Sequence, residues 1–133
     1  MKILALDLGT KTLGISISDE NKIFAIPKEN FLFDEGDFDS ALERVKWYLA
    51  NESIEMVLLG YPLKTNGDKA TITFLIEDFH LKLKNIVQTK LVDERYSTKR
   101  SLEMLSKSKK ILFKDQKDLM ASWVLLSDYL NQK

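Results

Sequence analysis

The sequence predicts an α/β domain built on a five-stranded mixed sheet, with helices on both faces. Three strand-like segments follow one another closely at the start of the chain, which is typical of an antiparallel meander. Two later strand-like segments are separated by stretches with helical spacing, which favours parallel strands joined by right-handed crossovers. A length of 133 residues fits one domain, which we expect to span residues 1–133.

The first three expected strands form the meander. Residues 2–8 are apolar at nearly every position, as in a central strand that is covered on both faces. After a tight turn, residues 13–18 alternate apolar with small or polar side chains, which is typical of a second strand. The third strand, residues 23–26, is expected to end at Pro27, because proline cannot donate to a strand ladder.

The rest of the chain alternates helices with strands. Asp37 or Asp39 is placed to cap a helix that runs to about Ala50, and an apolar strand follows at residues 55–60. The later elements indicated by spacing are a helix over 69–84, a strand over 86–92, a helix from Ser97 or Thr98 to about Ser106, and a last helix over roughly 115–131. This order places helices on both faces of the sheet.

The composition excludes several classes of protein. The chain has no cysteine and one histidine, so thiolate zinc sites and cysteine nucleophiles are ruled out and sites built on several histidines are disfavoured. Apolar residues make up 44% and charged residues 30%, a balance that is typical of globular proteins. No apolar run is long enough to span a bilayer, and the first residues lack the apolar stretch of a signal peptide. We therefore expect a cytoplasmic protein without a membrane partner.

Positive charge is concentrated in one part of the chain. Residues 1–81 hold 8 Lys and Arg against 14 Asp and Glu, whereas residues 82–117 hold 11 against 4. Such clustering can produce a positive surface that attracts phosphates, although solvated helix faces give the same pattern.

Three carboxylates stand at points where the expected elements begin or end. Asp7 lies at the carboxyl end of the first strand, Glu94 just past the fifth strand, and Asp118 near the start of the last helix. Because functional groups of open sheets gather where strand ends meet loops, the three side chains could converge on one site. Carboxylates without histidine or cysteine favour hard ions such as Mg²⁺ or Mn²⁺, and two such ions can promote phosphodiester hydrolysis.

Asp7 and Asp118 also have purely structural interpretations. An ionised Asp7 at the end of a buried strand needs compensation, which amide protons of Gly9 and Thr10 in the next turn could supply. Asp118 at a helix start interacts favourably with the helix macrodipole whatever its function.

Glu94 has a structural interpretation as well, as a solvated loop carboxylate paired with Arg95. Its neighbour Asp93 is a further candidate for the site. Successive residues of a strand point to opposite faces, so at most one of the two should face Asp7.

Four segments, taken in order, resemble the YqgF family, also called RuvX. They are LALDLGTKTLGISISD at 4–19, LGYPLKTNG at 59–67, VDERYST at 92–98, and the closing helix with KDLMASW at 117–123 and LLSDYL at 125–130. The family comprises small bacterial proteins with an RNase H-like fold. It is implicated in maturing the 5′ end of pre-16S ribosomal RNA and was earlier described as a group of Holliday junction resolvases. The resemblance covers essentially the whole chain.

The resemblance implies a metal-dependent nuclease of ribosome biogenesis, with an RNase H-like fold. It implies catalytic and metal-binding carboxylates at Asp7, Glu94 and Asp118, with Mg²⁺ or Mn²⁺ as cofactor. Substrate contacts are expected at Gly9, Thr10, Lys11, Asn66, Arg95, Lys99 and Arg100. The expected partners are pre-16S rRNA, or branched DNA as an alternative, and ribosomal precursor particles, bound by a monomer or a weak homodimer.

The chain departs from the family pattern at three places. Tyr61 replaces the usual leucine, and Asn66 replaces the usual aspartate, so any role of that carboxylate is absent here. The expected helix over 69–84 lacks an arginine that relatives often carry, which removes one expected phosphate contact.

Three other functions remain open at this point. The segment DLGT at residues 7–10 also fits the first phosphate loop of actin- and Hsp70-like ATPases, but those need two lobes, and 133 residues accommodate one. A non-catalytic RNA-binding factor of ribosome assembly would use the basic segment 82–117 equally well. A resolvase of four-way DNA would need a dimer with two active sites, and nothing in the sequence identifies a dimer interface.

Overall fold

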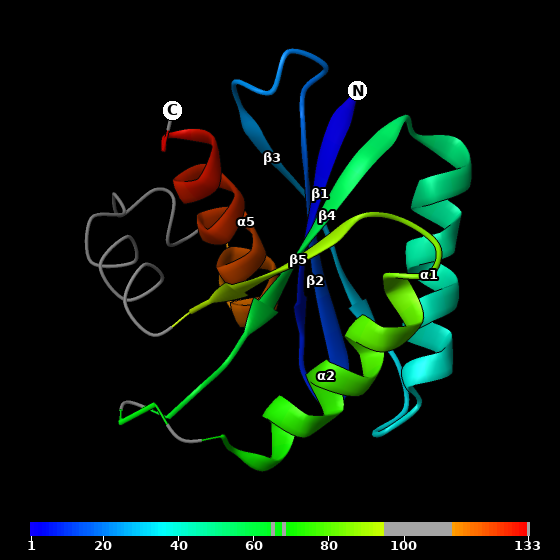
Figure 1. Cartoon of the computed structure of the whole chain (residues 1–133), viewed down its shortest axis with the longest axis vertical. Coiled ribbons are helices and arrows are strands. Elements are labelled where there is room, and N and C mark those ends of the chain that lie inside the picture. Colours follow the sequence, from blue (N-terminus) through cyan, green and yellow to red (C-terminus); the bar gives the residue numbers. More distant parts are fainter. Residues whose placement is uncertain (65, 68, 95–112, 133) are drawn as a thin grey trace.

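A five-stranded mixed sheet forms the centre of the molecule (Figure 1). The computed structural model describes residues 1–64, 66–67, 69–94 and 113–132. The strands are β1 (Lys2–Leu8), β2 (Thr12–Ser18), β3 (Ala25–Leu32), β4 (Ile54–Tyr61) and β5 (Thr89–Asp93), in the spatial order β3-β2-β1-β4-β5. Strand β1 pairs antiparallel with β2 and parallel with β4, β3 pairs antiparallel with β2, and β5 pairs parallel with β4. The predicted meander with two parallel crossover strands is confirmed.

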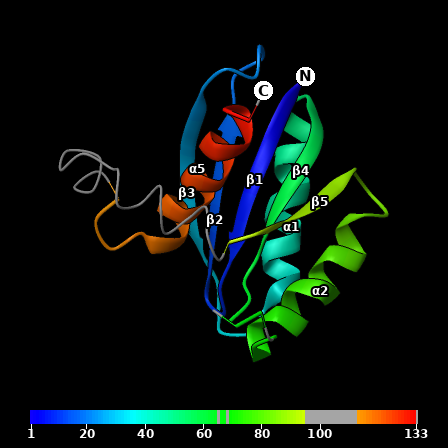
Figure 2. The same cartoon turned by 60° about the vertical axis from the view of Figure 1, so that its left-hand side comes forward.

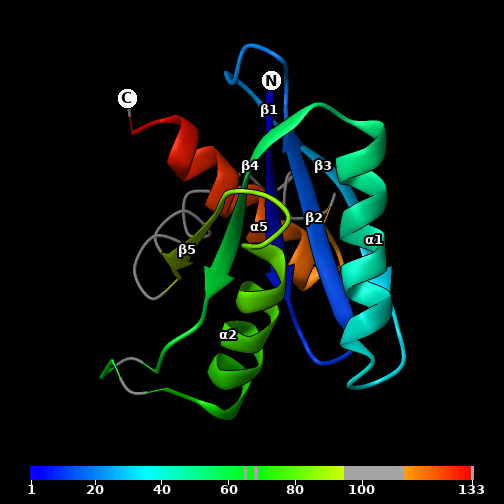
Figure 3. The same cartoon turned by 45° about the vertical axis from the view of Figure 1, so that its right-hand side comes forward.

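Helices cover both faces of the sheet. Helix α1 (Phe38–Asn51) and helix α2 (Thr71–Leu83) lie on one face, and helix α5 (Lys117–Leu130) lies on the other (Figure 3). Asp37 caps α1 as predicted, because its side chain accepts a hydrogen bond from the Ser40 amide. None of the helices in the described ranges has the length and apolar character needed to cross a bilayer.

The alternation of side chains along β1 divides the core in two. Leu4 and Leu6 belong to the larger cluster beneath α1 and α2, whereas Ile3 and Ala5 belong to the smaller cluster beneath α5. Asp7 shares the parity of Ile3 and Ala5, so its side chain is directed to the α5 face. The fold thus assigns Asp7 to the face that carries the last helix.

Helix α5 lies against β2 and β3 of the meander (Figure 2). Polar contacts, some of them buried, hold it there in addition to apolar packing. The hydroxyl groups of Ser16 and Ser122 lie 2.8 Å apart, and Ser122 also donates to the carbonyl of Leu119 (2.8 Å). The indole of Trp123 donates to the carbonyl of Ala25 (2.9 Å). These contacts fix the position of α5 along β2 and β3.

The third strand differs from its prediction. Strand β3 runs over Ala25–Leu32, so the expectation of a strand at 23–26 that ends at Pro27 is wrong. Pro27 is tolerated because β3 is an edge strand, and Pro27 pairs with Ser16 next to a shift in register.

The remaining elements agree with the sequence to within a few residues. Strand β5 begins at Thr89, three residues later than predicted. The helix expected from Ser97 or Thr98 to about Ser106 lies outside the described residues. The assignment of residues 1–133 to one domain stays a prediction.

Candidate active site

The three predicted carboxylates lie where β1, β5 and α5 meet. Asp7 is the next-to-last residue of β1, Glu94 directly follows β5, and Asp118 is the second residue of α5. All three side chains are half-buried. Asp7 and Glu94 come together because β1, β4 and β5 are parallel, so that their carboxyl ends lie at the same end of the sheet.

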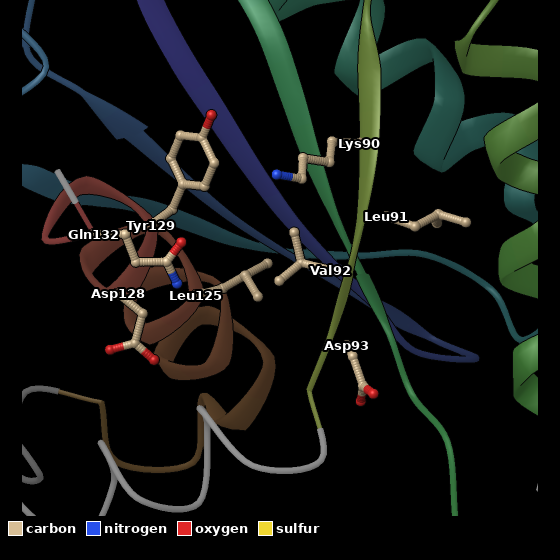
Figure 4. A pocket seen from close by; sticks show the side chains of 8 residues that line it. All are labelled: Lys90, Leu91, Val92, Asp93, Leu125, Asp128, Tyr129 and Gln132. Atoms are coloured by element: carbon tan, nitrogen blue, oxygen red, sulfur yellow. The ribbon is translucent and has the colours of Figure 1, made fainter. Parts of the chain in front are cut away.

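Glu94, and not Asp93, is directed toward Asp7. Figure 4 shows Leu91 and Val92 on opposite sides of β5, with Val92 on the side of α5. Glu94 shares the parity of Val92 and therefore points to the same side as Asp7. The expectation that only one of the two neighbouring acids faces Asp7 is in keeping with this placement.

A glycine in β4 makes room for Glu94. A Cβ atom at Gly60 would lie 2.6 Å from Glu94 Oε1 and 2.7 Å from its Cδ, closer than real Cβ contacts come. The carboxyl group of Glu94 therefore lies directly over the β4 backbone, between β5 and β1. Any side chain at position 60 would displace it.

Asp118 reaches the same place from α5. Its Oδ2 accepts a hydrogen bond from the Thr12 hydroxyl and would lie 2.7 Å from a Cβ atom at Gly9. The backbone of Asp118 rests on β2, since a Cβ atom at Gly14 would lie 1.9 Å from the Asp118 carbonyl oxygen. Gly14 in turn pairs with Asp7 in the sheet.

The three carboxyl groups influence one another strongly. Burial raises the pKa of Asp7 well above its ordinary value, and the negative charges of Glu94 and Asp118, together with hydrogen bonds to both, raise it further. Burial also raises the pKa of Glu94, and repulsion from Asp118 and Asp93 adds to this, while the hydrogen bond from Asp7 lowers it. Protonation is therefore favoured more strongly at Asp7 than at Glu94.

The donor set suits a hard divalent cation in kind and in charge. Three carboxylates that crowd together without protons repel one another, and a divalent ion relieves that repulsion with the oxygen ligands it prefers. As the side chains lie, no group of three or more acidic, histidine or cysteine residues in the described ranges surrounds a common point suited to a metal ion. A metal ion would have to compete with protonation of Asp7, and the carboxyl groups would have to turn toward a common point to share it.

The purely structural interpretations of Asp7, Asp118 and Glu94 have different outcomes. The Gly9 amide donates to the Thr12 carbonyl (2.7 Å), so it closes the turn instead of serving Asp7. Asp118 does lie in the first turn of α5, where it complements the helix dipole, but its carboxyl group is also held at the site. Arg95, the suggested partner of Glu94, lies outside the described residues.

The predicted substrate-binding positions form two groups. Gly9 lies against Asp118, and Thr10 and Lys11 are exposed in the adjoining β1–β2 turn. Asn66 is exposed in the loop between β4 and α2. Three further positions lie outside the described residues: Arg95, Lys99 and Arg100.

A cavity of about 230 Å³ lies beside the site, between β5 and α5 (Figure 4). Val92 and Leu125 supply apolar surface, and the Lys90 ammonium lies 5.3 Å from the centre of the Tyr129 ring. Asp93, the residue before Glu94, also lines the cavity. The cavity therefore lies between β5 and α5, on the face of the sheet to which Asp7 is directed.

Thr12 and Gly14 were not singled out from the sequence, although both hold Asp118 in place. A signal was present, because every second residue of β2 from Gly14 to Ser18 is small. A strand face made only of small residues indicates that another part of the chain approaches closely.

Comparison with known proteins gives one consistent family. The model of the family described as "RuvX: Holliday junction resolvase" matches residues 1–132. A protein of Mycoplasmopsis pulmonis named "Putative pre-16S rRNA nuclease" is 38% identical over 98% of this chain and 93% of its own length. A protein of Ureaplasma parvum with the same name is 39% identical over 99% of this chain and 97% of its own length.

A solved structure supports the same fold at low sequence identity. The RuvC structure from Thermus thermophilus covers 98% of this chain and 94% of its own, with a TM-score of 0.53 and 13% identity. At that identity the likeness concerns the fold alone, and it confirms the predicted RNase H-like architecture. From the match over nearly its full length and the identity to its relatives, this chain belongs to the RuvX family of nucleases.

Proposed function

We propose that this chain is an endonuclease that hydrolyses a phosphodiester bond near the 5′ end of pre-16S rRNA, with Asp7, Glu94 and Asp118 as ligands of Mg²⁺ or Mn²⁺. The observation that carries the proposal is the approach of Glu94 and Asp118 to Asp7 from two separate elements. The names of the mycoplasmal relatives support precursor rRNA as the substrate.

In this proposal, the three carboxylates hold the divalent ion on which the reaction depends. When bound, a divalent ion supplies Lewis-acid chemistry, which activates water and stabilises the charge that develops during displacement at phosphorus. The raised pKa of Asp7 means that the metal-free site favours the protonated carboxyl group, and a metal ion competes with that proton. Binding of the ion should therefore release a proton and strengthen as the pH rises.

The rim of the site supplies the substrate contacts in this proposal. Thr10 and Lys11 are exposed in the β1–β2 turn, beside the carboxylates. A phosphate of the RNA backbone can approach them there. Asn66 would contact the substrate from the loop after β4. Further contacts are assigned to Arg95, Lys99 and Arg100.

Four-way DNA is the second candidate substrate. The description of the matching family names Holliday junction resolvase, which supports this alternative. A resolvase must cut two strands and therefore needs two copies of the site. Substrate choice is thus an outcome of the test rather than an assumption in it.

The test is cleavage of labelled RNA by the purified chain. The substrates are a 5′-extended pre-16S fragment and a four-way DNA junction, each with Mg²⁺, Mn²⁺ or EDTA. We expect Asp7→Asn, Glu94→Gln and Asp118→Asn each to lower the cleavage rate by at least about 100-fold, the order of effect seen when a preorganised electrostatic group is removed. Asp78→Asn is the matched control, because Asp78 lies on α2, on the opposite face of the sheet, and pairs with Lys82.

Each contrary result has a distinct meaning. Full cleavage by the three amide variants, or cleavage in EDTA, would overturn the site and its metal. Binding of RNA without any cleavage would support the assembly-factor alternative. Cleavage of the junction but not of RNA would assign the chain to DNA.

A further inference from the structure

Thr12 occupies a fixed place beside the carboxylates. It is the first residue of β2 and is half-buried, and its carbonyl accepts the Gly9 amide (2.7 Å) in the β1–β2 turn. Its hydroxyl donates to Oδ2 of Asp118, 106 residues later in the chain. The hydroxyl is therefore carried by backbone that is already held in place.

The carboxyl group of Asp118 needs such a contact to stay where it is. When Asp7 is ionised, as a metal ligand must be, its charge repels that of Asp118 across the site, and this repulsion contributes to the raised pKa of Asp7. An aspartate in the first turn of a helix can turn outward to solvent, where its charge is hydrated. Gln116, the residue that caps α5, makes no side-chain hydrogen bond that would orient this turn.

We infer that Thr12 is a positioning residue, whose hydroxyl holds the carboxyl group of Asp118 beside Asp7. The inference rests on the proposed function, since Asp118 is a metal ligand only there. In this role Thr12 acts through Asp118 and not on the substrate itself. It acts by donating to one oxygen of Asp118, which leaves the other oxygen for a cation.

The Thr12 hydroxyl should matter for metal binding and turnover but not for binding of RNA. Groups that orient metal ligands typically change metal affinity or activity by about 10- to 100-fold when they are removed. Thr12 should therefore affect binding of the divalent ion and kcat, whereas the KM for RNA should remain unchanged. A residue that served only the stability of the fold would not produce this division.

The experiment compares Thr12→Val, Thr12→Ala and Thr12→Ser in the full chain. Valine keeps the shape of threonine without the hydroxyl, alanine is a second variant that lacks it, and serine keeps it. Mn²⁺ binding to the free protein is followed by electron paramagnetic resonance, and kcat and KM are measured on the pre-16S fragment. Thr89→Val is the matched control, because the Thr89 hydroxyl donates to the Val87 carbonyl (3.0 Å) at the other end of the sheet.

We expect the variants without the hydroxyl to weaken Mn²⁺ binding and to lower kcat by about 10-fold or more. We expect Thr12→Ser to restore both, and Thr89→Val to change neither. Unchanged Mn²⁺ affinity in Thr12→Val and Thr12→Ala would overturn the inference. So would an equal loss in Thr12→Ser, because the methyl group and not the hydroxyl would then be responsible.

Failure of the inference is distinguishable from failure of the proposed function. If Asp118→Asn still binds Mn²⁺ and cleaves RNA, the proposed site is wrong, whatever Thr12 does. If Asp118→Asn loses both while Thr12→Val keeps both, the site stands and Thr12 has no positioning role. The Mn²⁺ measurement decides this even if the RNA fragment is not the substrate.

Discussion

At the scale of single residues, Asp7 is the centre of the site and also a source of instability. It lies near the carboxyl end of a buried strand, and two further carboxyl groups approach it. The fold holds this unfavourable group because packing elsewhere compensates for it, as is common at functional sites. A divalent ion that entered the site would relieve the repulsion.

Removing the charge of Asp7 should stabilise the metal-free protein. The raised pKa means that the folded state favours protonated Asp7. This stabilisation is complete below the ordinary aspartate pKa of about 3.9. It is lost as the pH rises through the higher pKa of the folded state. In EDTA at pH 7, we therefore expect Asp7→Asn to increase the free energy of unfolding by about 1 kcal/mol, a gain typical of substitutions that relieve strain at functional sites.

Urea unfolding at pH 7 and pH 4 checks this expectation. The difference between Asp7→Asn and the parent chain should shrink toward pH 4, because Asp7 of the unfolded chain begins to take up its proton near the ordinary pKa of about 3.9. Asp78→Asn serves as the comparison, because Asp78 is exposed on α2. A variant at position 7 that is no more stable than the parent at pH 7 would contradict the expectation.

At the scale of elements, the packing of α5 against β2 determines where Asp118 lies. The face of β2 beneath the helix consists of Gly14, Ser16 and Ser18, so the helix backbone can approach the sheet directly. The Ser16–Ser122 contact fixes the helix along the strand. Close approach, and not apolar area alone, brings the first turn of α5 to the carboxylates.

Gly14→Ala should disturb both the fold and the site. Its Cβ atom would lie 1.9 Å from the Asp118 carbonyl oxygen, so the start of α5 must shift. We expect the free energy of unfolding to fall by about 1–3 kcal/mol, as for other overpacked positions, and cleavage to fall because Asp118 moves with the helix. Urea unfolding and the cleavage assay, under conditions where the variant is folded, measure the two effects.

Gly36→Ala separates a general loss of stability from displacement of the helix. Gly36 has φ +81°, and a Cβ atom there would meet no atom within 4 Å. Alanine at this position should cost about 1 kcal/mol through its left-handed backbone, without loss of cleavage. Equal cleavage by the two alanine variants would show that α5 need not rest on Gly14.

At the scale of the whole molecule, the crossover strands and the helices place the site at the carboxyl ends of the parallel strands, and two of its carboxylates, Glu94 and Asp118, belong to or directly follow the most basic part of the sequence. Residues 82–117 hold 11 Lys and Arg against 4 Asp and Glu, and they include Glu94 and end at the first residue of α5. A nucleic-acid strand drawn to this segment would be brought toward the carboxylates.

Binding of RNA should therefore depend steeply on salt. If lysine and arginine side chains of this segment neutralise about four phosphates, affinity should fall by about 10- to 100-fold between 50 and 200 mM salt, because condensed ions are released on binding. Fluorescence anisotropy with labelled RNA in EDTA measures this without cleavage. A dissociation constant that does not change between 50 and 200 mM salt would show that the basic segment does not bind the RNA phosphates.

Much of the fold followed from local patterns, and the exceptions have physical causes. The meander, the crossovers and the cap at Asp37 were predicted because periodicity and capping chemistry act over a few residues. The course of β3 through Pro27 was missed, because the tolerance of an edge strand for proline depends on which strand lies at the edge.

The sequence by itself determined that Asp7 and Glu94 stand at the carboxyl ends of two strands, because strand-like patterns and the points where they end can be read along the chain. Only the tertiary structure decided that Glu94, over the bare backbone of Gly60, faces Asp7, and that the Thr12 hydroxyl meets Asp118. The second of these contacts joins residues 106 positions apart. Such a contact depends on how closely a helix can approach a strand, and that distance is set by packing across the whole domain and not by any local segment.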